Sequence, residues 1–298
     1  MRFGLVGTGY WARVTHAAVL AREPGVELVA VWGRHADKAE ALGSEFAIEA
    51  YTEFSEFLSG LDAVAFAVPP DVQAELAVAA AGAGKHLLLD KPLATSLAAA
   101  ERLVDAVDHA GVSTVVFFTA RFDETKRQWL ATLEAGDWEG AWVRWIVSAF
   151  APDSPYANSP WRREKGALWD VGPHALSVLT AALGPVASVT ADGGAGDLVH
   201  LVFHHQSGAT STASLTLDAP PAAINVELSV WGPSGVSTMP LAGSTAVEAY
   251  GVALRELLGN VRAGEASHPC DVHFGASVVR TLADAEGQIA SRRLGPVL

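Results

Sequence analysis

Apolar and polar positions follow two different orders along this 298-residue chain, and the order changes near residue 120. Before that point, short apolar runs of strand length alternate with segments of helical periodicity. Strict alternation of strand and helix indicates parallel strands joined by helical crossovers. We therefore predict an α/β domain with a doubly wound parallel sheet over residues 1–120. Its strands are expected at 2–6, 27–32, 63–68, 86–89 and 113–118, and its helices at 11–22, 36–42, 72–83 and 96–110.

Beyond residue 120, strands follow one another. After a helix at 123–134, a strand at 141–149 and the turn-rich stretch APDSPYANSP, a further helix is expected at 173–183. Runs of adjacent strands are typical of antiparallel sheets. We therefore predict an α+β domain with a large open antiparallel sheet over residues 121–298. Its later strands are expected at 187–191, 198–205, 210–217 and 225–231, and its last helices at 245–263 and 274–290.

Composition narrows the class of protein. Half of the residues are hydrophobic and 18% are charged, which excludes a disordered chain. Twenty Lys and Arg against 33 Asp and Glu argue against nucleic-acid binding. The longest apolar runs fall short of the roughly 18 residues of a membrane span, so we expect no membrane association. The single cysteine, Cys270, fits a cytoplasmic protein, although a secreted protein without disulfides would look the same.

A glycine-containing turn, GTGYWA, separates the first expected strand from the first helix. Glycines there let the backbone turn tightly and approach a pyrophosphate, at which the helix N-terminus is directed. A sharp turn without a ligand is the alternative, but the βαβ setting favours a Rossmann dinucleotide site. The residues expected to hold the cofactor are Gly7, Thr8, Gly9, Tyr10, Trp11 and Ala12.

The second expected strand ends without the acidic residue that binds the ribose of NAD. Gly33 occupies that position and Arg34 follows it. A guanidinium suits the 2′-phosphate of NADP through charge-assisted hydrogen bonds, with His35 and Lys38 as helpers. The alternative is that Arg34 is an ordinary exposed charge. We favour NADP over NAD.

Two further segments carry candidate catalytic residues. Asp90 and Lys91 end a strand at the carboxyl edge of the parallel sheet, where doubly wound folds bind ligands. Asp170 and His174 are four residues apart near the start of a helix. Histidine accepts protons near neutral pH, and a nearby carboxylate can orient it. The alternative is that Asp170 caps the helix and His174 packs in the core.

Taken in order, these motifs resemble the Gfo/Idh/MocA family, named for glucose–fructose oxidoreductase and inositol 2-dehydrogenase. The resemblance covers GTGYWA at 7–12, the segment AVPPDVQAELAVAAAGAGKHLLLDKPLA at 67–94, RFDE at 121–124 and WRREKGALWDVGPH at 161–174. It implies a Rossmann domain followed by a domain whose open antiparallel sheet makes homodimer or homotetramer contacts.

The resemblance also implies residue roles. Lys91 would lie near nicotinamide and substrate, and Asp170 and His174 would complete the catalytic site, with His174 as acid/base. The further cofactor-binding residues that it suggests are Val68, Pro69, Pro70, Asp90 and Lys91.

Three departures from the family pattern stand out. Asp90 replaces the usual Glu, and Gln73 replaces a common histidine, which would alter contacts on the cofactor side. Lys165, Gly166 and Ala167 stand where a run of glycines is usual, so the shape of the substrate pocket would differ.

These residues together predict hydride transfer between nicotinamide and a carbon bearing a secondary hydroxyl or carbonyl. His174 would move the hydroxyl proton and Lys91 would polarise the oxygen. Arg121, Trp161 and Arg162 would shape the substrate end, and their polar and aromatic character suits a sugar, cyclitol or other polyol.

Two alternatives stay open: a sensor that binds NADP and a sugar without turnover, and a redox-neutral enzyme that retains its nicotinamide cofactor. No metal site is expected. His200, His204 and His205 cluster in sequence, but strand alternation would place His205 opposite the other two.

Overall fold

The computed structural model describes residues 1–294 and divides the chain into two compact units. Unit 1 comprises Met1–Asp123 and Ser244–Ser277, and unit 2 comprises Glu124–Gly243 and the described residues from Val278 onward. The expected division into 1–120 and 121–298 differs from this one mainly because the chain returns to unit 1 for residues 244–277.

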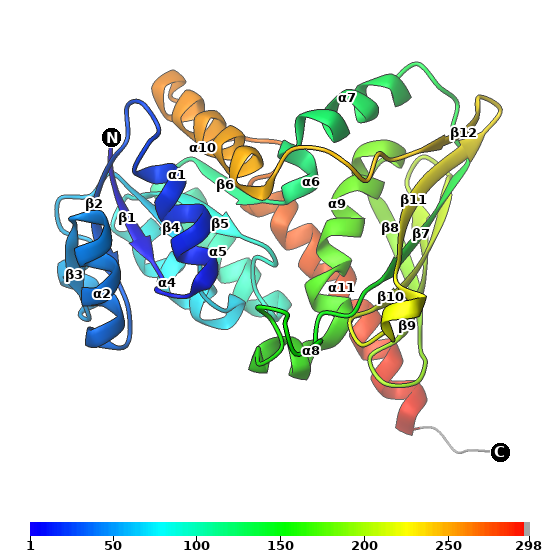
Figure 1. Cartoon of the computed structure of the whole chain (residues 1–298). Helices are drawn as coiled ribbons and strands as arrows, with labels where there is room; N and C mark the ends of the chain where they lie inside the picture. Colours follow the sequence, from blue (N-terminus) through cyan, green and yellow to red (C-terminus); the bar gives the residue numbers. More distant parts are fainter. Residues whose placement is uncertain (295–298) are drawn as a thin grey trace. The chain divides into compact units, whose positions relative to one another are not determined.

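Six strands form the sheet of unit 1, all parallel, in the order β3-β2-β1-β4-β5-β6 (Figure 1). The expected doubly wound parallel sheet is therefore confirmed. The chain adds β2 and β3 on one side of β1 and then adds β4, β5 and β6 on the other side. The strand order therefore reverses between β1 and β4, and a doubly wound sheet binds ligands at such a switch point. The strands are β1 (Arg2–Val6), β2 (Glu27–Trp32), β3 (Glu49–Tyr51), β4 (Ala63–Phe66), β5 (His86–Asp90) and β6 (Thr114–Phe117).

Helices cover this sheet because its strands are apolar along their whole length; every residue of β4, for example, is buried. A helix was expected at 11–22, and half of that segment, Ala12–Ala17, is π-helical. The helices are η1 (Ala12–Ala17), α1 (Ala18–Leu20), α2 (Ala36–Phe46), α3 (Phe54–Phe57), α4 (Pro70–Gly82), α5 (Leu97–Ala110), α6 (Thr119–Phe122) and α10 (Ala246–Ala263). The last of these packs against η1, β5 and β6, which completes the core of unit 1.

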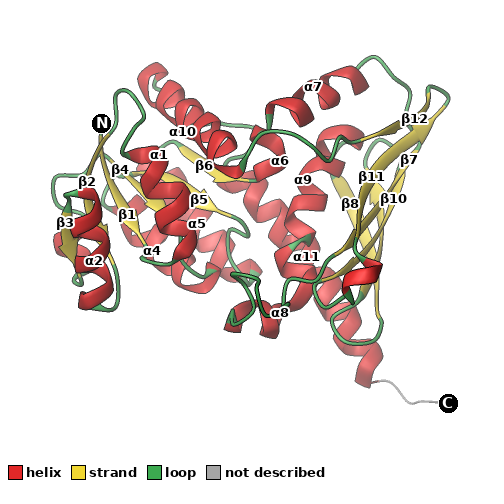
Figure 2. Cartoon of the chain, in the orientation of Figure 1, coloured by secondary structure: helices red, strands yellow, loops and turns green. Residues whose placement is uncertain are grey.

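The sheet of unit 2 has the order β12-β11-β7-β10-β9-β8 (Figure 2). It is mixed, because β7 pairs in parallel with β10 while the other pairs are antiparallel. The expected antiparallel sheet is confirmed for the other strand pairs, and the parallel pair arises because β7 lies between two strands that come much later in the chain. The strands are β7 (Gly140–Ile146), β8 (Val186–Gly193), β9 (Val199–His205), β10 (Thr210–Thr216), β11 (Asn225–Gly232) and β12 (Gly235–Thr238).

One face of this sheet packs on helices, as the alternation along β9 shows. His205 is buried with Leu201 and Phe203, whereas His200 and His204 are exposed, so the expected separation of the three histidines is confirmed. The helices of unit 2 are α7 (Glu124–Leu133), α8 (Pro160–Asp170), α9 (Gly172–Leu183), the short η2 (Pro221–Ala223) and the part of α11 (Val272–Leu294) from Val278. Within residues 1–294, no helix combines the length and apolarity needed to cross a membrane.

Candidate functional site

The turn after β1 lies at the switch point of the unit 1 sheet. Gly7 has φ +123°, and a Cβ there would stand 2.4 Å from the carbonyl oxygen of Ala67 at the end of β4. A Cβ at Gly9 would meet nothing within 4 Å. The first glycine thus lets two strand ends pack closely, and the second leaves the backbone open to an incoming group. This backbone suits a pyrophosphate.

The end of β2 has no room for a side chain at Gly33. A Cβ there would lie 2.7 Å from the Thr8 methyl carbon Cγ2, so the turn after β1 fills the space of the usual acidic residue. Arg34 is exposed and, within the described chain, makes no hydrogen bond or ion pair. Its guanidinium is therefore available to an anionic ligand.

The segment after β4 leads directly into α4. Val68 is half-buried, Pro69 is the N-cap of α4 in extended conformation, and Pro70 is in the first turn. Proline suits that position because its missing N–H would be unpaired there. This start aims the buried face of α4, which carries Gln73, at the end of β5.

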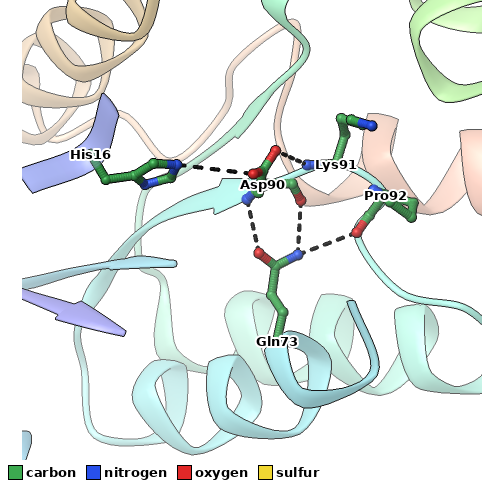
Figure 3. Close-up of polar contacts among 5 residues, drawn as sticks. All are labelled: His16, Gln73, Asp90, Lys91 and Pro92. Carbon is green, nitrogen blue, oxygen red and sulfur yellow. Dashed lines mark hydrogen bonds and ion pairs between the residues drawn. The ribbon is translucent and has the colours of Figure 1, made fainter. Parts of the chain in front are cut away.

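Gln73 binds the turn that follows β5 (Figure 3). Its Oε1 accepts from the backbone N–H of Asp90 at 2.8 Å, and its Nε2 donates to the carbonyls of Asp90 at 2.8 Å and of Pro92 and Leu93 at 3.3 Å. Gln73 is 1% exposed. The departure from the family pattern at this position therefore concerns the support of the Asp90–Lys91 turn.

Asp90 also acts within the turn. Its Oδ1 accepts from the backbone N–H of Lys91 at 2.8 Å, and the Lys91–Pro92 peptide bond is cis. Lys91 is half-buried at the carboxyl end of β5, the edge at which the sequence placed it. In Figure 3 the Lys91 ammonium points away from the Asp90 carboxylate.

Two buried side chains that sequence reasoning missed lie beside this turn. His16 of η1 is fully buried with Nε2 3.9 Å from Asp90 Oδ2, and its ring centroid lies 4.2 Å from that of Tyr250 of α10. Among residues 1–294, neither ring nitrogen of His16 nor the Tyr250 hydroxyl has a hydrogen-bond partner. Burial lowers the pKa of His16 to about 3 and raises that of Tyr250, with a further contribution from the charge of Asp90. The only sequence signal was a histidine nine residues after Gly7.

In unit 2, Asp170 ends α8 and is paired with Arg162. Arg162 Nε lies 3.0 Å from Asp170 Oδ2, and the guanidinium stacks over Tyr156 at 4.2 Å and Trp161 at 4.6 Å. Both charged side chains are mostly buried. The structure thus brings Trp161 and Arg162, expected at the substrate end, together with the catalytic candidate Asp170.

His174 lies in α9, with Pro173 in the first turn as expected. Its ring stacks on Trp145 of β7 with centroids 5.6 Å apart and planes at 18°. The helix break at Val171 puts Asp170 and His174 on successive helices rather than one above the other on a single helix.

Residues 165–167, which stand where a run of glycines is usual in the family, keep one glycine at a position where the backbone requires it. Gly166 has φ +65°, inside α8, a conformation that other residues adopt only with strain. Lys165 Nζ lies 3.2 Å from Glu286 Oε1, which also accepts from Trp169 Nε1 at 3.0 Å. Lys165 is therefore tied to α11.

Of the remaining candidates, Arg121 lies on α6 in unit 1, with its guanidinium 5.7 Å from the Phe274 ring centroid. The catalytic candidates are divided, with Lys91 in unit 1 and Asp170 and His174 in unit 2. Among the described residues, no group of three or more His, Cys, Asp or Glu side chains gathers to hold a metal ion.

Two family models match this chain. Residues 1–118 match the model described as "Oxidoreductase family, NAD-binding Rossmann fold", and residues 124–237 match the "GFO/IDH/MocA C-terminal domain". In structure, the chain is similar to the WlbA dehydrogenase from Bordetella pertussis, solved with NADH and UDP-GlcNAcA. The TM-score is 0.85 at 22% identity, covering 98% of this chain and 97% of that one.

Curated relatives agree with these matches. "Uncharacterized oxidoreductase YdgJ" of Escherichia coli is 29% identical over 64% of this chain and 56% of its own length. "D-xylose 1-dehydrogenase (NADP(+)) 2" of Haloferax volcanii is 31% identical over 74% of this chain and 70% of its own length. The chain spans only 34 to 56% of the first three curated relatives it matches. The matched models and relatives show that the chain belongs to the Gfo/Idh/MocA family of oxidoreductases.

Proposed function

We propose that this protein is an NADP(H)-dependent dehydrogenase or reductase that acts on a secondary alcohol or carbonyl of a sugar, cyclitol or similar polyol. The observation that carries the proposal is that two features lie together in unit 1. One is the open glycine turn at the switch point, and the other is Lys91 at the end of β5, next to the Asp90 backbone that Gln73 holds. The name of the Haloferax relative, a D-xylose dehydrogenase, supports the substrate class.

Different residues of unit 1 would bind different parts of the dinucleotide. The backbone from Gly7 to Ala12 would hold the pyrophosphate, and Arg34 would pair with the 2′-phosphate of NADP. Filling of the Gly33 site by Thr8 supports this preference, because a ribose-binding carboxylate has no space there. The nicotinamide cofactor, when bound, supplies or accepts the hydride.

The protein's own part in the reaction would be proton transfer and orientation. Lys91 would donate a hydrogen bond to the substrate oxygen, and His174 would take up or return its proton. Stacking on Trp145 fixes the plane of the His174 ring. The Arg162 guanidinium balances the charge of Asp170 beside the start of α9.

The test is a panel assay. Purified protein is mixed with NADP, NADPH, NAD or NADH and with sugars, polyols, inositols and dicarbonyl compounds, and absorbance at about 340 nm is followed. A dehydrogenase changes the absorbance with at least one substrate. Cofactor binding with no absorbance change and no product indicates a sensor, and product without net absorbance change indicates a redox-neutral enzyme. Either result overturns the proposal.

Variants test the residue roles. Lys91→Ala and His174→Ala should each lower kcat by about 10²- to 10⁴-fold while the Kd for NADPH stays the same. Arg34→Ala should weaken NADP binding much more than NAD binding. Arg102, an exposed arginine on α5 bonded to its own helix, provides the matched control Arg102→Ala, which should change neither. Equal weakening of both cofactors by Arg34→Ala would contradict the assignment to the 2′-phosphate.

A further inference from the structure

A cluster of three polar side chains, His16, Tyr250 and Asp90, lies within unit 1 behind the turn that carries Lys91. They come from η1, α10 and β5, which are far apart in sequence. Figure 3 shows His16 reaching the Asp90 carboxylate from the left, while Gln73 contacts the turn from below. The proposed reaction gives His16 and Tyr250 no role so far.

The unpaired atoms of this cluster are unusual for a protein interior. Both nitrogens of His16 and the hydroxyl of Tyr250 are buried, and no described residue pairs with them in a hydrogen bond. Buried polar atoms are almost always paired, because an unpaired one loses its hydrogen bonds to water and gains none in the protein. The rings of His16 and Tyr250 are in contact, and His16 faces the Asp90 carboxylate, so the pair points to a shared role beside Asp90.

The geometry identifies the acceptor. Asp90 Oδ1 is engaged by the Lys91 backbone N–H, whereas Oδ2 lies 3.9 Å from His16 Nε2. That separation is about 1 Å longer than a hydrogen bond, so a small shift of either side chain closes it. The charge of Asp90 also acts on the Tyr250 hydroxyl.

The environment also fixes the charge of the donors. His16 has no exposed surface, and its ring contacts the Tyr250 ring at a tilt of 45°. The Tyr250 ring in turn packs edge-on against Phe117 at 5.1 Å. Its pKa of about 3 keeps the imidazole neutral at neutral pH, with one N–H. A carboxylate facing Nε2 favours the tautomer with the proton on Nε2.

We propose that His16 is a positioning residue, a neutral buried donor that holds the Asp90 carboxylate and, through it, the backbone of Lys91. Gln73 fixes the backbone of the turn from α4, and His16 fixes its side-chain end from η1, with the ring of Tyr250 of α10 packed against the His16 ring. The inference rests on the proposed function for the role of Lys91, but the contact with Asp90 stands independently.

Substitutions separate a positioning role from mere packing. His16→Met keeps the bulk and removes the donor, and should lower kcat about tenfold, the scale of one hydrogen bond to a charged group, with little change in KM or in the Kd for NADPH. His16→Gln restores a donor and should recover most of the loss.

A double-mutant cycle shows whether Asp90 transmits the effect. In the Asp90→Asn background, His16→Met should cause little further loss. The matched control is His205→Gln in unit 2, since His205 is also buried but pairs both nitrogens, with the Gly184 carbonyl and Ser211 Oγ, at 2.8 Å each. This variant should leave kcat unchanged. Independent, additive losses from His16→Met and Asp90→Asn would overturn the proposal.

A second measurement needs no substrate. In full-length protein with ¹⁵N-labelled histidine, His16 should show a protonated Nε2 and a neutral ring from about pH 5 to pH 8, and Asp90→Asn should shift the Nε2–H resonance. An Nδ1–H tautomer, or a resonance unmoved by Asp90→Asn, refutes the contact. If the wild type shows no turnover with any substrate, the proposed function fails, and this spectrum still decides the contact on its own.

Discussion

The buried, neutral His16 should make the stability of unit 1 depend on pH in a defined window. Its pKa is about 3 in the folded protein against 6.5 as the ordinary value. Below pH 6.5 the unfolded chain takes up a proton at this residue and the folded chain does not, so acid favours unfolding. The contribution is absent above pH 6.5 and grows until the pH falls to about 3.

The magnitude follows from the width of that window. Each pH unit between the two pKa values is worth about 1.36 kcal/mol, so His16 should cost roughly 2 kcal/mol of unfolding free energy on going from pH 7 to pH 5. Replacing it by an apolar residue of similar bulk, His16→Met, should remove this dependence. Other groups titrate in both proteins alike, including His86 and His205, whose pKa values burial also lowers.

The assay is urea unfolding of wild type and His16→Met at pH 7 and pH 5, with the free energy of unfolding taken from each transition. The wild type should lose about 2 kcal/mol more than the variant between the two pH values. His205→Met serves as a control for loss of a buried histidine in unit 2. Equal losses in wild type and His16→Met would mean that His16 is hydrated or charged in the folded protein, and the account of its environment would be wrong.

Three other substitutions test separate features. Gln73→Leu should lower the free energy of unfolding by about 2–3 kcal/mol, because it leaves backbone groups of Asp90 unpaired in the interior; a midpoint in urea equal to that of the wild type would contradict this. Gly33→Asp should weaken NADP binding at least about tenfold by charge repulsion. It should confer a preference for NAD only in combination with Thr8→Ser, which deletes the methyl group 2.7 Å from the new Cβ. Fluorescence titration of each variant with each cofactor decides this. Gly166→Ala should cost about 1–2 kcal/mol at its φ of +65°, measured by thermal unfolding, and an unchanged Tm would show that α8 tolerates the strain.

Unit 1 was largely predictable because each long strand and helix carries its own periodic signal. The elements that escaped are short, such as β3 and α3, with three and four residues. The helix α8 was hidden because it follows a turn-rich stretch and contains Gly166 in a non-helical conformation. The parallel pairing of β7 with β10 has no local signal at all, since strands some 70 residues apart form it.

For the candidate site, residue types and motifs located Lys91, Asp170 and His174, but not the side chains that support them. Gln73 was visible only as a departure from a pattern, and its bonds to the turn after β5 emerge only from the fold. Tyr250 carried no signal, because a tyrosine on the buried face of a helix is an ordinary core residue.

The return of the chain to unit 1 bears on how this protein is made. The helix α10 covers β5 and β6, yet it is translated after all six strands of unit 2. During synthesis, unit 1 therefore cannot complete its core until the strands of unit 2 have left the ribosome. Until then, the apolar surface that Tyr250, Leu254 and Leu257 cover in the folded protein stays exposed. A nascent chain of this kind invites chaperone binding, and a recombinant fragment that stops before Ser244 should aggregate. Laboratory chimaeras that exchange the two units would need three crossover points rather than one, after Asp123, Gly243 and Ser277.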